Sequence, residues 1–412
     1  MEMYDVCIIG GGASSSMLAI LLAKNGKKVC VVDRFSKPAK KLLVTGNGRC
    51  NITNQNLSSE FYNQNIDNFL NKFGYQNTIS FFESIGIDVY ADGEGRCYPI
   101  SNSAKSVQIA IINQFEKLKI KFFGESEAIS CDYKNQAYNV KVKRISNETE
   151  NGNSKTDIQK QSFKEFEICS TNLVIASGIN DFAFDIFEKF NIKTNKVVPS
   201  LVALKTKQST KKLDGVRISN VLVEAASMNS KKTEVGEVLF KDHGLSGICI
   251  FNLSSIFAKN KCFDGKISIN LQKNASKSQI FENLYTKSQI FENTLDMLCS
   301  MFSKEISAEI LERCKIDLQS KTKELKENQL QKIAFEIENF SFDVEGTYQN
   351  NQVLSGGVDL KCLTENLESK TQNGLFFCGE ICDVDGVCGG YNLQWAWASA
   401  HAVAKGIENN WF

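Results

Sequence analysis

The chain has 412 residues, of which 42% are hydrophobic and 23% charged, and these values predict a globular protein of two or three domains. Its 48 basic and 47 acidic side chains leave a net charge of +1, which gives no overall attraction to nucleic acid or to anionic membranes, so we expect neither as a partner. No apolar run approaches the roughly 20 residues that span a bilayer, and the first apolar stretch has no charged leader, so we expect a cytoplasmic location.

Fourteen cysteines are scattered along the chain without a secretion signal or a CxxC pair. This distribution favours reduced thiols that pack as small apolar residues over a disulfide framework. A zinc site would need Cys378, Cys382 and Cys388, but gaps of three and five residues are poor zinc spacing, so we predict no metal.

The chain opens with a β–α–β pattern. Residues 4–9 form an apolar stretch typical of a buried strand, and residues 13–26 have helical spacing that ends at a glycine. Residues 28–33 then predict a second strand that ends in an acid.

A glycine fingerprint, Gly10-x-Gly12-x-x-Ser15, lies between the first strand and the helix. In this context the first glycine permits a tight turn, the second lets the backbone approach a pyrophosphate, and the helix N-terminus supplies N–H groups. Asp33 follows Gly10 by 23 residues at the end of the second strand, where an acid can accept hydrogen bonds from an adenosine ribose. Together these features predict a dinucleotide site.

A second glycine-rich loop, "LLVTGNGRCNITN" at residues 42–54, follows the second strand. It lacks the Gly-Lys-Ser/Thr ending of a nucleotide triphosphatase loop. A third glycine cluster lies near the end of the chain, within residues 379–393. NAD dehydrogenases continue with further βαβ units, whereas FAD is long and needs donors from remote segments for its flavin end, so we predict FAD.

The middle of the chain changes character several times. Residues 60–86 predict helices, residues 90–99 a hairpin, and a helix runs from a serine cap to about Leu118. Residues 119–176 predict strands, interrupted by a polar tract at 144–162 that we interpret as a solvated loop. Residues 195–272 alternate as in a β domain, and residues 276–338, which lack glycine and proline, predict helices.

The last segment predicts a strand, a turn and a helix that begins at two glycines. The first N–H groups of that helix, those of Gly390, Tyr391 and Asn392, can point at a ligand oxygen. If the oxygen is the flavin C2 carbonyl, the helix dipole stabilises negative charge that develops at N1. Trp395 and Trp397 are expected to be core aromatics.

Other polar residues of these segments have two interpretations. Glu380 can hydrogen-bond ribityl hydroxyls or a phosphate-bound water, whereas Asp383 and Asp385 are better read as turn caps than as an acid pair. Cys50 invites a redox-active interpretation, but no resolving cysteine is close in sequence, so packing against the flavin is favoured.

Six blocks together resemble the BaiN/YhiN-type FAD-dependent oxidoreductases, whose FAD domain is similar to that of glutathione reductase. They are "DVCIIGGGAS", "KKLLVTGNGRCNITN", "GRCYPISNSAKSV", "PSLVAL", "GEVLFKDHGLSG" and "GLFFCGEICDVDGVCGGYNLQWAWASA". The resemblance implies an α/β fold, with a discontinuous Rossmann-type FAD-binding domain, an inserted β-barrel-like domain and a small helical domain. The expected bounds are 1–192 and 354–412, 193–275 and 339–353, and 276–338.

The resemblance also implies that the second loop lies along FAD and brings one cation to it, and Lys41 either adds a second charge or is a solvated surface lysine. The expected cofactor-binding residues are Gly10, Gly12, Ala13, Ser14, Asp33, Arg34, Lys41, Gly46, Gly48, Arg49, Cys50, Asn51, Ala128, Ala176, Ser177, Gly178, Gly379, Glu380, Gly389, Gly390, Tyr391, Asn392 and Leu393.

The chain departs from the family pattern at three points. Ser15 replaces the third fingerprint glycine, so either helix and strand pack farther apart or its hydroxyl helps to hold phosphate. The paired glycine and the glycine-rich stretch that the family has near Gly178 are reduced here to "ASGINDFAFD". The histidine position of the family falls on Asp242, and the neighbouring His243 is either a substitute or a solvent-exposed turn residue.

No second glycine fingerprint follows, so NADH or NADPH would act as a transient reductant, or substrate would reduce the flavin and oxygen reoxidise it. The resemblance implies NAD(P)H-driven reduction of a small-molecule enone by hydride transfer through flavin N5, with Tyr391 as a candidate proton donor. Two alternatives are an oxygen-using, amine oxidase-like flavoprotein and a flavin-binding regulatory or interaction protein.

Overall fold

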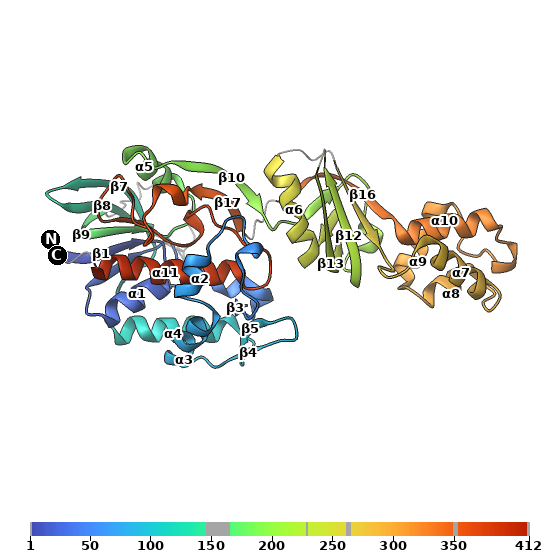
Figure 1. Cartoon of the computed structure of the whole chain (residues 1–412), viewed down its shortest axis with the longest axis horizontal. Helices are drawn as coiled ribbons and strands as arrows, with labels where there is room; N and C mark the ends of the chain where they lie inside the picture. The colour runs from blue at the N-terminus through green and yellow to red at the C-terminus, as the bar shows by residue number, and fades with distance from the viewer. Residues whose placement is uncertain (1, 146–164, 228–229, 261–264, 349–352, 410–412) are drawn as a thin grey trace, which may run out of the picture. The chain divides into compact units, whose positions relative to one another are not determined.

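The computed structural model describes residues 2–145, 165–227, 230–260, 265–348 and 353–409. The chain folds into two compact units, Met1–Val197 with Ser355–Phe412, and Val198–Leu354 (Figure 1). Both ends of the chain therefore belong to the first unit. The predicted solvated loop at 144–162 lies almost entirely outside the described residues.

The first unit is built on a seven-stranded sheet of order β6-β2-β1-β9-β8-β7, with β18 also paired to β9. Strands β6, β2, β1, β9 and β18 run parallel, and β7, β8 and β9 form an antiparallel meander. The parallel strands are apolar along most of their length because both faces are covered. The bounds are β1 (Met3–Ile9), β2 (Val29–Val32), β6 (Lys121–Phe123), β7 (Ser126–Lys134), β8 (Ala137–Arg144), β9 (Glu165–Ile175) and β18 (Leu375–Phe377).

Helices from distant parts of the chain cover this sheet. The first helix, α1, packs against the last, α11, and Figure 1 shows α1, α4 and α11 on one side of the sheet. A small sheet of β3, β5 and β4 contains the predicted hairpin. The bounds are α1 (Ala13–Lys24), α2 (Asp67–Lys72), α3 (Tyr75–Ser84), α4 (Ala104–Lys117), α5 (Asp181–Lys189), α11 (Tyr391–Asn409), β3 (Thr53–Asn54), β4 (Val89–Ala91) and β5 (Arg96–Pro99), with short 3₁₀ helices η1 (Lys40–Gly48), η2 (Ser59–Phe61), η5 (Leu360–Cys362) and η6 (Gly379–Ile381).

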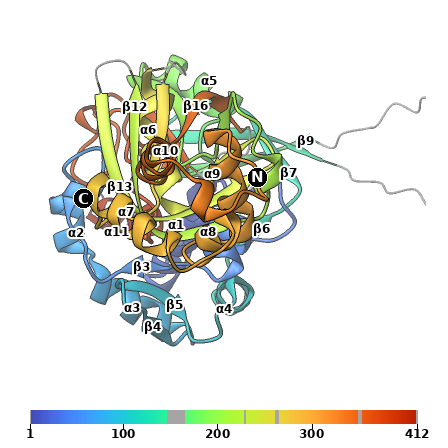
Figure 2. The ribbon, with the colours of Figure 1, turned by 90° about the vertical axis from the view of Figure 1, so that its right-hand side faces the viewer.

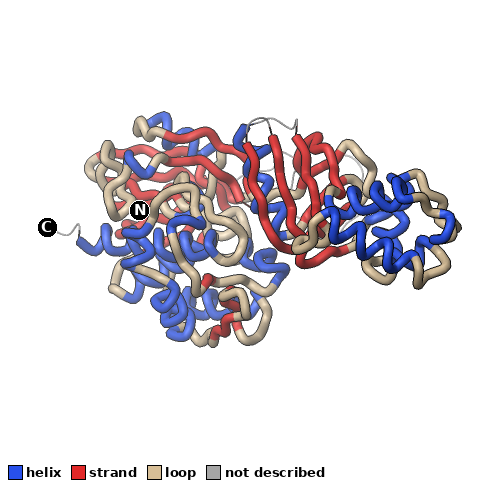
Figure 3. The backbone as a smooth tube through the Cα atoms, turned by 45° about the vertical axis from the view of Figure 1, so that its right-hand side comes forward, coloured by secondary structure: helices blue, strands red, loops and turns tan. Residues whose placement is uncertain are grey.

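The second unit contains a closed barrel of order β11-β14-β13-β12-β15-β16, red in Figure 3. Its interior is filled by side chains such as Val223, Phe240, Ile267 and Phe342. The bounds are β11 (Leu204–Thr206), β12 (Arg217–Ser227), β13 (Ser230–Lys241), β14 (Gly244–Ser246), β15 (Gly265–Asn270) and β16 (Phe340–Thr347), with η3 (Lys211–Leu213) between β11 and β12. The α/β fold with an inserted barrel is thus confirmed.

One helix of this unit was not expected. The sequence predicted only strands over 195–272, but Ile248–Asn260 forms helix α6, which packs on β12 and β13. Its buried apolar residues include Cys249, Ile250, Leu253 and Phe257, whose spacings of three and four are helical. The surrounding alternation of apolar and polar residues concealed this short helical period.

Helices over 276–338 are confirmed. They are α7 (Lys277–Ser288), α8 (Thr294–Cys299), α9 (Lys304–Cys314) and α10 (Glu327–Glu338), with η4 (Thr322–Glu324), and they gather beside one another (Figure 1, Figure 2). Their buried residues share one apolar cluster with the barrel. The separation of barrel and helices into two domains, with the bounds given above, stays a prediction.

The chain passes between the two units inside paired strands, β10 (Thr194–Ser200) and β17 (Val353–Val358). Over the residues that the structure describes, no helix is long and apolar enough to cross a bilayer.

We expect Gly10→Ala to destabilise the first unit. Gly10 has φ +101°, and an added Cβ would overlap the Ser177 backbone after β9. Strain and overpacking of this kind cost about 2 to 5 kcal/mol together. Urea unfolding followed by circular dichroism measures the loss.

Gly12→Ala is the matched control. Its φ is −75°, and an added Cβ would meet no atom within 4 Å. Its free energy of unfolding should fall by less than about 1 kcal/mol. Equal losses in the two variants would contradict the packing role of Gly10.

Candidate functional site

The three consecutive glycines after β1 have different surroundings. Gly10 packs on the Ser177 backbone, and Gly11 packs on Asp33 while its N–H donates to the Asp33 Oδ2 atom. Gly12, at the N-cap of α1, faces open space. The N-terminus of α1 is therefore accessible there, which fits a pyrophosphate.

Asp33 lies at the end of β2 beside Gly11, and its contact with a ribose stays a prediction. Its Oδ1 atom accepts from the Phe35 N–H at 2.7 Å, and its carbonyl accepts from Ser126 N–H at 2.9 Å. The second contact brings the start of β7, which carries Ala128, to the end of β2. Arg34 is exposed, and its guanidinium lies 5.1 Å from the ring centroid of Phe35.

The hydroxyls of the first helical turn are occupied within the protein. Ser15 is fully buried, and its Oγ donates to the Gly12 carbonyl at 3.0 Å, which favours a packing role over phosphate binding. Ser14 Oγ donates to the Cys378 carbonyl at 3.4 Å, and a Cβ on Gly379 would overlap that hydroxyl. Ala13 and Ser14 thus lie beside the turn after β18.

The second loop owes its glycines and asparagine to its backbone. Gly46, Asn47, Gly48 and Cys50 all have φ between +55° and +81°, the left-handed region that glycine and asparagine tolerate best. Arg49 is exposed, and its guanidinium lies 4.5 Å from the ring centroid of Tyr98 on β5. Its Nε also donates to the Gly46 carbonyl at 3.3 Å, so this cation stands at the surface of the loop.

Cys50 is buried, and burial raises the pKa of its thiol to about 12. None of the 13 cysteines that the structure describes is in a disulfide. A protonated thiol without a disulfide partner is a poor nucleophile, which favours the packing interpretation of Cys50.

Residues of the second loop and of the lysine just before it lie in contact with residues of the last segment, 379–393. Lys41 Nζ pairs with Glu380 Oε2 at 3.2 Å, and a Cβ on Gly178 would lie 3.5 Å from the same oxygen. In the amide orientation that satisfies its neighbours, Asn51 Oδ1 accepts from the Gly390 N–H at 3.1 Å. The second loop and the start of α11 are therefore adjacent, as are the turns after β9 and β18.

A buried glutamine that the sequence analysis did not single out holds this region together. Gln394 Oε1 accepts from Thr53 Oγ1 at 2.6 Å and from Thr78 Oγ1 at 2.9 Å, and its Nε2 donates to the Phe73 carbonyl at 2.8 Å. The sequence signal that could have indicated Gln394 is its position within the "GGYNLQWA" block.

The two tryptophans of α11 are buried core residues, as predicted. Each also anchors a loop, because Trp397 Nε1 donates to the Ile52 carbonyl at 2.9 Å and Trp395 Nε1 to the Gly379 carbonyl at 3.0 Å. Helix α11 thereby holds the second loop at Ile52 and the turn after β18 at Gly379.

The expected set of free N–H groups at α11 needs correction. The Gly390 N–H is used by Asn51, which leaves the Tyr391 and Asn392 N–H groups as candidate donors. The Asn392 side chain forms two hydrogen bonds with the Gly386 backbone, at 2.9 and 2.7 Å, and Leu393 is half-buried.

The contacts of Tyr391 favour packing over proton donation. Its hydroxyl donates to the Asn56 carbonyl at 3.3 Å, and its ring stacks on Phe61 with centroids 4.7 Å apart. Burial raises the pKa of this hydroxyl. Its role as proton donor stays a prediction.

The acids of the turn after η6 accept hydrogen bonds from distant segments, β10 and β17, and their role as turn caps stays a prediction. Asp383 accepts from the Gly356 N–H at 3.1 Å and from Asn195 Nδ2 at 2.7 Å, and Asp385 accepts from Ser355 Oγ at 2.6 Å. Within the described ranges no group of three His, Cys, Asp or Glu side chains could hold a metal. In the second unit, His243 is exposed in the turn between β13 and β14, in line with the turn interpretation.

Comparison with known proteins gives a match to the family described as HI0933-like protein Rossmann domain, over residues 4–406. The chain is 28% identical over 420 residues to a 3-dehydro-bile acid delta(4,6)-reductase of Clostridium scindens, covering 98% of both chains. It is 25% identical over 426 residues to a ribosomal RNA dihydrouridine synthase of Escherichia coli, covering 99% of this chain and 98% of that protein. Among solved structures, an open flavocytochrome c3 fumarate reductase is 12% identical, with a TM-score of 0.42 over 98% of this chain and 79% of that one.

We expect Cys50→Ala to retain most of the activity of the parent protein. The buried thiol stays protonated below its pKa of about 12, so native protein should resist iodoacetamide at Cys50 up to pH 9. Mass spectrometry of alkylated peptides measures the modification. Rapid labelling of Cys50 in folded protein, or a 100-fold loss of turnover in the variant, would contradict this expectation.

We expect Gly12→Val to lower FAD retention at least tenfold, because its side chain would fill the open space at the N-terminus of α1. The ratio of visible to ultraviolet absorbance after desalting measures bound flavin. Ser15→Ala is the control and should keep its flavin, since that hydroxyl bonds within the helix. Full flavin content in a folded Gly12→Val protein would refute the assignment of the open space beside Gly12 to the FAD pyrophosphate.

Proposed function

Because the chain belongs to the HI0933-like family and is an FAD-dependent oxidoreductase, we propose that it reduces a carbon–carbon double bond conjugated to a carbonyl group. The names of two relatives support this reaction. A 3-dehydro bile acid with double bonds at positions 4 and 6 is a conjugated ketone. Dihydrouridine is uridine whose C5–C6 double bond, conjugated to the C4 carbonyl, has been reduced.

The observation that carries the proposal is the contact between Asn51 and Gly390, which joins the second loop to the start of α11. We assign the pyrophosphate to Gly12 and the N-terminus of α1, and the ribose to Asp33. We assign the flavin ring to residues 46–51 and 389–393. FAD, when bound, supplies hydride transfer through flavin N5.

In this proposal the protein contributes orientation and electrostatics. The first turn of α11 presents N–H groups and the positive end of a helix dipole, which favours negative charge beside it. The chain delivers the substrate β-carbon to the hydride, and a proton completes the addition at the α-carbon. We assign that proton to no side chain, because the Tyr391 hydroxyl already donates to Asn56.

We propose NADH or NADPH as the electron source. It would dock transiently, because the sequence has a single glycine fingerprint of the dinucleotide type. The overall reaction consumes one NAD(P)H, one proton and one double bond, and yields NAD(P)⁺ and the saturated product. A small-molecule substrate and a cytoplasmic location remain part of the proposal.

A uridine in RNA is the second candidate substrate. It is favoured by the relatives named ribosomal RNA dihydrouridine synthase, from Escherichia coli and Haemophilus influenzae. The net charge of +1 weighs against it, since it supplies no long-range attraction to a polyanion.

Anaerobic mixing of the purified holoprotein with NADH and NADPH tests the proposal. We expect one of them to bleach the visible flavin band, and a 3-oxo-4,6-diene bile acid or unmodified ribosomal RNA to restore it with one product per flavin. The first acceptor would identify the small-molecule class, and the second the RNA class.

Two results would contradict the proposal. Bleaching by an amine with recovery only in oxygen would identify an amine oxidase-like enzyme. Failure of every reductant and substrate to change the flavin spectrum would favour a regulatory or interaction protein.

A further inference from the structure

A polar groove lies in the second unit, where the start of α7 and the end of α9 meet one face of α10. Its volume is about 520 Å³. The α10 residues that line it include Asn328, Gln331, Lys332 and Phe335, whose spacing of three and four places them on a single helix face. The opposite face of α10 is buried, so this groove is the solvent-facing side of the helical layer.

Three lysines give the groove a surplus of positive charge. Lys277 on α7, Lys315 after α9 and Lys332 on α10 line it, and in the described part of the chain none has a carboxylate within 4 Å.

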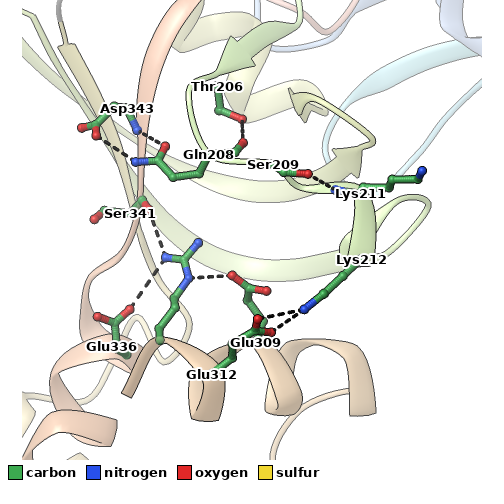
Figure 4. A network of polar contacts seen from close by, with 11 residues as sticks. Thr206, Gln208, Ser209, Lys211, Lys212, Glu309, Glu312, Glu336, Ser341 and Asp343 are labelled. Atoms are coloured by element: carbon green, nitrogen blue, oxygen red, sulfur yellow. Dashed lines mark hydrogen bonds and ion pairs between the residues drawn. The ribbon is translucent and has the colours of Figure 1, made fainter. Parts of the chain in front are cut away.

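The arginine of the same groove is already neutralised. Arg313 pairs with Glu309 at 2.9 Å and with Glu336 at 3.7 Å, and donates to the Ser341 carbonyl at 3.0 Å. Figure 4 shows Glu309, Glu336 and Ser341 converging on this guanidinium. The three lysines therefore supply the cations that are available to a ligand.

An exposed aromatic ring lies among these cations. Phe335 is 49% exposed, and Lys277 Nζ lies 5.4 Å from its ring centroid. Asn328 and Gln331 precede it on the same face and bring amide donors and acceptors. Ammonium groups suit a phosphate, an aromatic face suits a planar base, and amides suit the polar edge of that base.

We propose that this groove binds a free nucleotide, with the base against Phe335 and the phosphates at Lys332 and its neighbouring lysines. The volume falls in the range of about 300 to 1,000 Å³ that is usual for small-ligand sites. A polynucleotide is disfavoured because the chain has a net charge of only +1. This site is independent of the proposed reaction, which does not require it.

Calorimetric titration of the FAD-loaded protein with ADP tests the proposal, because bound FAD blocks the dinucleotide site. We expect saturable binding that Lys332→Ala weakens at least tenfold. Phe335→Ala should weaken ADP binding at least fivefold while leaving inorganic pyrophosphate unaffected. Lys323→Ala removes an exposed lysine of η4 outside the groove and should change nothing.

The thermal unfolding temperature and flavin content of each variant establish that it is folded. Three outcomes would overturn the proposal: no saturable ADP binding, ADP affinity no higher than that of pyrophosphate, or equal effects of Lys323→Ala and Lys332→Ala. Preferential binding of a 12-residue oligouridylate over ADP would also overturn it, in favour of a polymer site. If Lys332→Ala loses ADP binding but keeps its enzymatic turnover, the groove is separate from the active site and the proposed reductase function is unaffected.

Discussion

The contact between Asn51 and the Gly390 N–H is the constraint on which the candidate site depends. It joins two loops that are more than 330 residues apart in sequence, and it is possible because position 390 has no side chain. A Cβ there would clash with the Thr53 carbonyl and crowd the Asn51 amide. The Gly389–Gly390 pair therefore serves first as a close approach between backbones, and the start of α11 is positioned as a consequence.

Burial determines which polar groups near this contact remain available for chemistry. Gln394, Trp395 and Trp397 use their polar atoms to hold backbone carbonyls or threonine hydroxyls, so they fix the loops and take no part in proton transfer. Cys50 is held protonated by desolvation. The N-terminus of α1 beside Gly12 remains open, and this arrangement suits a protein that positions a cofactor and leaves the redox step to it.

Local sequence predicted the parts of this fold that depend on near neighbours. The β–α–β opening, the hairpin near 90–99 and the helices over 276–338 each follow from periodicity and turn chemistry within about 20 residues. Helix α6 was missed because its apolar period covers barely three turns inside a region of alternating residues. The use of the Gly390 N–H by Asn51 was also missed, since no local pattern reports which acceptor an amide from a distant loop will provide.

By itself the sequence determined where the site requires glycine: a turn after β1, a glycine-rich loop at 42–54 and a helix that begins at paired glycines. These follow from steric limits on φ and ψ at single positions. The tertiary structure decided which of the predicted groups are free, because burial and long-range hydrogen bonds are properties of the packed chain. It placed Tyr391 in an aromatic stack with Phe61 and Arg49 on the surface against Tyr98, for reasons that lie in their distant neighbours.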